Sequence, residues 1–161
     1  MKKMIATLAL MITCQVSFAQ NIETVFDAFK YKQGADYLKI SPLMMKVVHL
    51  FADKDAQSQF VRNIKSAKIL DLEDCQTNVK ENFIQQIKEL SLNGYETFFV
   101  STENGETVKL LAKTDKKNIN ELLVLTAGKG DCNIVQLKGK IKKEDIQMMV
   151  TDDKIMINGR K

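Results

Sequence analysis

The chain has 161 residues, of which 45% are hydrophobic and 27% charged, and its formal net charge is +4. The first 19 residues contain two lysines and no acidic residue, so their removal would lower the charge to +2. A charge so small and mixed excludes nucleic acid or anionic lipid as a partner attracted by net charge. The even spread of apolar residues excludes a disordered or low-complexity chain.

Residues 1–19 have the features of a signal peptide. Two lysines precede an apolar run that ends at Cys14 and is too short to span a bilayer, and Ser17 and Ala19 form a small-x-small cleavage site. We expect cleavage after Ala19 and export to the periplasm or the exterior, with residues 20–161 forming one domain. Alternatively, Cys14 is the lipid-modified first residue of a lipoprotein. No later segment is apolar for long enough to span a membrane.

The first part of the predicted domain mixes helices and strands. Apolar spacing of i, i+3, i+4 and i+7 predicts a short helix over residues 22–30, and residues 36–40 alternate like a strand. Ser41 and Pro42 then favour the start of a helix over residues 43–51. A weak helical turn is expected within residues 54–65.

A further strand and the longest helix follow. Residues 67–72 alternate as a strand, and Asp74 or Thr77 could cap a helix whose apolar stripe runs to Leu90. Gly94 is expected to close this helix.

The second half changes to the two-residue period of strands. Asn104-Gly105 predicts a tight hairpin between residues 95–102 and 106–113, and two further turns precede strands over residues 119–127 and 132–141. A short helix is expected over residues 143–150. The sequence therefore predicts an α+β fold with a mainly antiparallel sheet: a C-terminal four-strand meander, one or two N-terminal strands, and helices packed on it.

The strand over residues 119–127 is apolar on both faces, which is typical of a central strand. Helices should cover one face. The other would present Leu111, Leu123 and Leu125, and either the helices at residues 22–30 and 43–51 cover it or it is an interaction face. A lipidic ligand, a partner protein or a second copy of the chain would each bury such a face.

The strand over residues 132–141 has one polar face with Gln136, Lys138 and Lys140. If this strand lies at the sheet edge, its lysines protect against edge-to-edge pairing. The alternative is an anion-binding stripe.

No catalytic, cofactor or metal site is predicted. His49 is the single histidine and lies in an apolar stretch, and the motifs of serine hydrolases, zinc proteases and nucleotide-binding loops are absent from the sequence. Cys75 and Cys132, each at the border of an element, form a possible disulfide, or else remain two separate, partly buried thiols.

Four stretches, which together cover most of residues 20–161, resemble a known family: YLKISPLMMKVV, AKILDLEDC, GYETFFVSTENGETVKLLAKTD and NINELLVLTAGKGDCNIVQLKGKIKKEDI. The family consists of uncharacterised small exported proteins and lipoprotein-type domains of Gram-negative bacteria, catalogued as domain of unknown function 4252. The resemblance implies an α+β domain outside the cytoplasm with no established activity, so no site residues are carried over. Many relatives have a lipobox, from which this leader departs.

We therefore expect a non-enzymatic binding module of the cell envelope. Its partner would be a protein or an apolar ligand, with a homodimer as a further possibility, and no nucleic acid. The alternatives are an enzyme with an unrecognised site and a self-assembling structural component.

Overall fold

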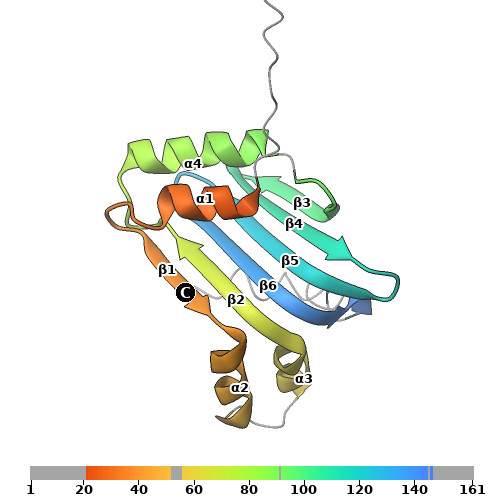
Figure 1. Ribbon diagram of the computed structural model, residues 1–161. Coiled ribbons are helices and arrows are strands. Elements are labelled where there is room, and N and C mark those ends of the chain that lie inside the picture. Colours follow the sequence, from red (N-terminus) through yellow and green to blue (C-terminus); the bar gives the residue numbers. More distant parts are fainter. Residues whose placement is uncertain (1–20, 52–55, 91, 145, 147–161) are drawn as a thin grey trace, which may run out of the picture.

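The computed structural model describes residues 21–51, 56–90, 92–144 and 146. Its centre is a six-stranded antiparallel sheet with the strand order β1-β2-β6-β5-β4-β3 (Figure 1). The strands are β1 (Asp36–Ile40), β2 (Ile64–Asp71), β3 (Glu96–Glu103), β4 (Glu106–Thr114), β5 (Asn118–Ala127) and β6 (Cys132–Lys142). The predicted α+β fold, with a C-terminal meander and two N-terminal strands, is confirmed.

Four helices lie around the sheet: α1 (Ile22–Phe29), α2 (Pro42–Phe51), α3 (Ala56–Asn63) and α4 (Thr77–Glu89). Helices α1 and α4 cross the upper part of one sheet face, whereas α2 and α3 extend from its lower end (Figure 1). Of the final helix expected over residues 143–150, the described positions 143, 144 and 146 are helical. The predicted leader, cleavage site and Cys14 lie outside the described residues.

Local signals placed the turns and one helix start correctly. Asn104 and Gly105 both have positive φ, at 51° and 81°, as a type I′ hairpin turn requires. At the start of α2, Ser41 caps the helix, with its Oγ accepting a hydrogen bond from the Met44 amide at 3.3 Å.

Three boundary predictions were wrong. The N-cap of α4 is Gln76, which makes no side-chain capping bond, and neither Asp74 nor Thr77 holds this position. The helix ends at Glu89, so Gly94 lies in the following turn instead of closing the helix. The strand predicted from residue 67 begins at Ile64, directly after α3.

The main core lies between α1, α4 and one sheet face, which we call the front face. Val25, Phe26 and Phe29 of α1 are buried there against Leu123 and Leu125 of β5. The ring of Phe29 meets that of Phe83 edge-on at 5.4 Å, which joins α1 to α4. The apolar stripe predicted for residues 22–30 therefore becomes the buried face of α1.

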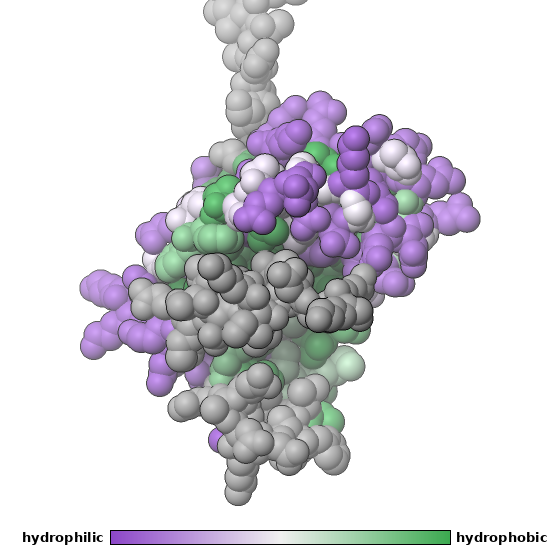
Figure 2. All heavy atoms as spheres, turned by 180° about the vertical axis from the view of Figure 1, so that it is seen from behind, coloured by the Kyte–Doolittle hydropathy of each residue, from purple (hydrophilic) through white to green (hydrophobic). Residues whose placement is uncertain are grey.

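The back face carries a second core. Leu110, Ala112, Ile119 and Leu122 are buried there together with Ile141 and Ile146. Seen from behind, polar residues predominate at the upper right of the molecule, and apolar residues are visible from the upper left through the middle (Figure 2). Helix α2 contributes Met45, which packs against Ile64 and Ala67 near the lower end of β2.

Candidate functional site

The predicted interaction face is mostly interior. Leu123 and Leu125 are buried, and Leu111 is half-buried against the same core. The cover is intramolecular, but it consists of α1 and α4, not of α1 and the helix over residues 43–51, whose Met45 packs elsewhere. The sequence could not locate this cover because α4 reaches the face only through the tertiary fold.

One open part of this face remains as a groove. It has a volume of about 310 Å³ and lies between the end of α4 and strands β3 and β4. Leu111 and Leu125, two residues of the predicted face, line it together with Leu90, Leu92 and Val100. Val100 is 52% exposed, so the groove opens to solvent with an apolar wall.

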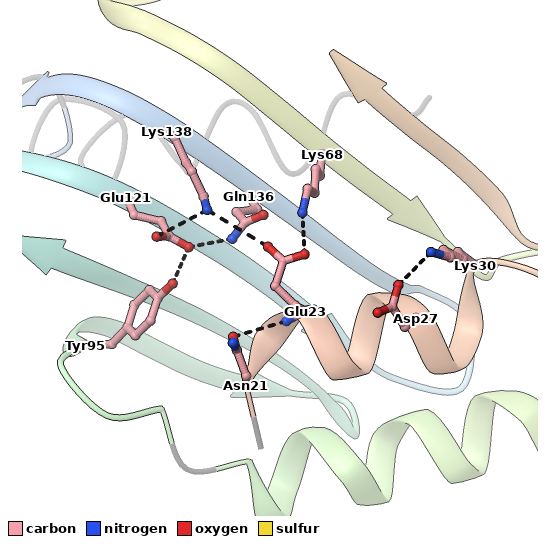
Figure 3. A network of polar contacts seen from close by, with 9 residues as sticks. All are labelled: Asn21, Glu23, Asp27, Lys30, Lys68, Tyr95, Glu121, Gln136 and Lys138. Atoms are coloured by element: carbon pink, nitrogen blue, oxygen red, sulfur yellow. Dashed lines mark hydrogen bonds and ion pairs between the residues drawn. The ribbon is translucent and has the colours of Figure 1, made fainter. Parts of the chain in front are cut away.

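A network of polar side chains crosses the front face beneath the start of α1 (Figure 3). At its centre is Glu121 of β5, whose side chain is only 12% exposed. Its carboxylate accepts hydrogen bonds from the Tyr95 hydroxyl and from Nε2 of Gln136. The ammonium group of Lys138 lies 3.8 Å from the same carboxylate.

The network continues through Glu23 in the first turn of α1. Glu23 forms an ion pair with Lys68 of β2, and its other oxygen lies 3.9 Å from Nζ of Lys138. Asn21 caps α1 by accepting a hydrogen bond from the Glu23 amide at 3.3 Å. Negative charge near a helix N-terminus also stabilises the helix, so Glu23 anchors α1 in two ways.

Burial within this network shifts the titration of Tyr95. Removal of the phenol from water raises its pKa, and the hydrogen bond to the Glu121 carboxylate raises it further. Tyr95 is therefore a hydrogen-bond donor at neutral pH. Together with Gln136 and Lys138, it stabilises the negative charge of Glu121 inside the fold.

The structure settles two features of the polar face of β6. The strand lies between β2 and β5, so it is not an edge, and edge protection does not explain its lysines. Gln136 is also only 1% exposed, and its Oε1 is buried with no hydrogen-bond partner among the described residues. The anion-binding alternative for this face remains untested.

Cys75 and Cys132 lie in the same core cluster, as the predicted proximity required, but both are free thiols. Cys132 donates a hydrogen bond from Sγ to the Gly128 carbonyl oxygen at 3.0 Å. Burial raises the pKa of both thiols, which reduces the fraction of reactive thiolate at neutral pH.

Among the described residues, no group of three or more His, Cys, Asp and Glu side chains could hold a metal ion. His49 lies in α2, but its side chain is outside the described part of the chain. No helix within the described ranges is both long and apolar enough to cross a membrane.

Sequence reasoning missed Tyr95, Glu121 and Glu23 as members of a common site. One signal was present: Glu121 is the single acidic residue inside the apolar strand INELLVLTA. An acidic residue in an apolar strand needs partners, but only the register of β5 against β6 brings Gln136 and Lys138 to it, and only the tertiary fold brings Tyr95.

Comparison with known proteins gives one match. The family model described as domain of unknown function (DUF4252) matches residues 29–149, which include all six strands. No curated protein and no solved structure matches the chain.

Proposed function

The chain belongs to the DUF4252 family, and we propose that it is a non-enzymatic interaction module that acts outside the cytoplasm and holds an apolar segment of a partner protein in the groove beside β3. The family assigns no activity. The groove is the observation that carries the proposal, because it is open to solvent, combines apolar side chains with the polar groups of Tyr95, Thr97 and Lys109, and lies next to a strand at the edge of the sheet.

The position of β3 favours an extended peptide as the occupant. Among the described strands, β3 pairs only with β4, so its other edge has backbone groups available for hydrogen bonding. A peptide that adds to such an edge gains main-chain hydrogen bonds, and its alternate side chains face one side of the sheet. On the front side these side chains would meet Val100 and the leucines of the groove.

The charged groups support binding over catalysis. The Glu121 carboxylate, the most enclosed acid of the network, accepts hydrogen bonds from Tyr95 and Gln136, lies beside the start of α1 (Figure 3), and is not among the residues that line the groove. A general acid or base must instead reach a substrate atom directly or through one water. Export rests on the leader sequence, with its two lysines, its short apolar run and its small-x-small site before residue 20.

The groove can be tested with two matched substitutions. Val100 and Leu38 are exposed to nearly the same extent, 52% and 50%, on the two opposite edge strands. We expect Val100→Lys to lose a partner that the wild-type chain captures from its own cell envelope, while Leu38→Lys retains it. Cross-linking from a photoreactive residue at position 100, followed by mass spectrometry, should identify the contacting segment.

Three results would contradict the proposal. Equal capture by all three proteins would show that the groove is not the binding surface. A lipid that copurifies with the wild-type chain but not with Val100→Lys would identify a small apolar ligand instead of a protein. Self-association that Val100→Lys abolishes in sedimentation measurements would make a second copy the occupant.

A further inference from the structure

A second pocket lies on the front face, at the opposite side of the sheet from the groove. Its volume is about 110 Å³, and it is formed where β1 passes into α2 beside β2 and β6. Its cationic lining residues are Lys39, Lys68 and Lys138, one from each of three neighbouring strands.

The strand register concentrates positive charge in this pocket. Lys39 is paired directly opposite Lys68, and like charges in this arrangement repel each other. Lys39 forms no ion pair with any described residue. Two carboxylates lie near the other two lysines. Glu23 approaches both Lys68 and Lys138, and Glu121 approaches Lys138 while also accepting the hydrogen bonds of the polar network.

Two further features favour an anion. Ser41 and Pro42 place the N-terminus of the ten-residue helix α2 in the lining, and the first turn of α2 has no acidic residue. The N-terminus of a helix carries partial positive charge, which attracts anions. Ser66, opposite Lys138 in the register, adds a hydroxyl group to the lining.

Gln136 restricts the kind of anion. It lines the pocket, is 1% exposed, and its Oε1 has no described partner, while its Nε2 donates to Glu121. A buried acceptor needs a donor. A suitable ligand therefore has negatively charged oxygens for the lysines and one O–H for Gln136.

We propose that this pocket binds a phosphate group. At neutral pH, inorganic phosphate carries both negative oxygens and an O–H, whereas a phosphate monoester has an O–H only in its monoprotonated form, the minor species above its second pKa of about 6. Sulfate has the oxygens but no proton to donate. In the absence of ligand, the Glu23 carboxylate occupies two of the three lysines, so it acts as an internal competitor.

Titration of the purified chain with inorganic phosphate, followed by NMR chemical shifts or calorimetry, tests the proposal. We expect saturable binding that weakens with added salt and weaker binding of sulfate at equal ionic strength. Lys39→Gln should weaken phosphate binding about three- to fivefold, since Lys39 is exposed. Lys117→Gln, which removes the same charge at an exposed turn outside the pocket lining, should change it little.

Glu23→Gln should change the affinity for phosphate in the opposite direction. Removal of the competing carboxylate should tighten phosphate binding about threefold. A thermal unfolding curve for each variant verifies folding, and Ser66→Ala provides a second loss variant if Glu23→Gln detaches α1.

Separate binding experiments distinguish which kind of phosphate compound the pocket prefers. Methyl phosphate tests a monoester, and vesicles of phosphatidylcholine with and without phosphatidic acid test a lipid headgroup. The proposal is overturned if inorganic phosphate shows no saturable binding, or if Lys39→Gln and Lys117→Gln bind it equally. Failure of the groove to hold a peptide would leave this result unaffected, because the two sites share no lining residue.

Discussion

Substitution of Gly139 by alanine should destabilise the chain strongly. A Cβ at this position would lie 2.1 Å from the Asn63 carbonyl oxygen and 3.0 Å from Cα of Ile64, whereas ordinary contacts begin at 3.4 Å. Both neighbours are backbone atoms, so no flexible side chain can move aside. The end of α3 and the first residue of β2 would have to shift by about 1 Å or more.

The expected cost follows from what that shift disturbs. Gly139 pairs with Ile64 at the end of the β2–β6 ladder, next to a register irregularity between Ile64 and Ser66. Overpacking of this kind costs about 1–3 kcal/mol, and each lost backbone hydrogen bond adds about 1 kcal/mol. We expect a loss of about 2–4 kcal/mol in the free energy of unfolding, or about 4–16 °C in Tm.

Urea unfolding followed by circular dichroism measures this loss, with Gly130→Ala as the control. A Cβ at Gly130 would meet nothing within 4 Å, and the residue has no positive φ. Its replacement should change stability by at most about 1 kcal/mol. If Gly139→Ala and Gly130→Ala unfold at the same urea concentration, the close approach of α3 to β6 is not a constraint on the fold.

Three further predictions concern the front face and the thiols. Tyr95→Phe should cost about 1–3 kcal/mol, because the largely enclosed Glu121 carboxylate loses a donor. The pKa of Tyr95 is raised in the folded chain, so the unfolded chain loses the phenol proton first as pH rises above about 10. The free energy of unfolding of the wild type should therefore fall above this pH, and that of Tyr95→Phe should fall less. Urea midpoints that depend on pH identically in the two proteins would contradict this. Leu123→Lys should abolish cooperative unfolding while Leu111→Lys retains it, since the first residue is buried in the core and the second borders the groove. Cys75 and Cys132 should react slowly with a thiol reagent in the native chain and fully in denaturant; no reaction without a reductant would reveal a disulfide.

The sequence specified the local features of this fold well. Asn104-Gly105 predicted a hairpin turn because few residue pairs tolerate two positive φ angles, and Ser41-Pro42 predicted a helix start because both residues satisfy its special geometry. These signals depend on neighbours in the chain. These turns and helix starts can therefore be predicted without knowledge of the strand order.

The strand order and the placement of the helices could not be predicted from such local signals. β6 follows β5 in the chain and pairs with it, but its second neighbour is β2, which lies more than sixty residues earlier. That pairing converts a supposed edge into an interior strand and brings Lys68 opposite Gln136. The polar network and the phosphate pocket exist only because of this nonlocal pairing.

One sequence signal nevertheless marks where the front face changes from apolar to polar side chains. Alternate residues of β6 on this face begin with the buried Cys132 and Ile134 and continue with Gln136 and Lys138. Helix α1 has eight residues and is therefore about 12 Å long, whereas eleven residues of β6 extend about 36 Å. Because α1 crosses the strands over the upper part of the sheet, it covers only part of β6, and polar side chains on the rest of this face need partners of their own. Gln136 is still buried, so the change from Ile134 to Gln136 marks where the apolar core under α1 gives way to the polar network, and the candidate phosphate pocket begins at the same residue.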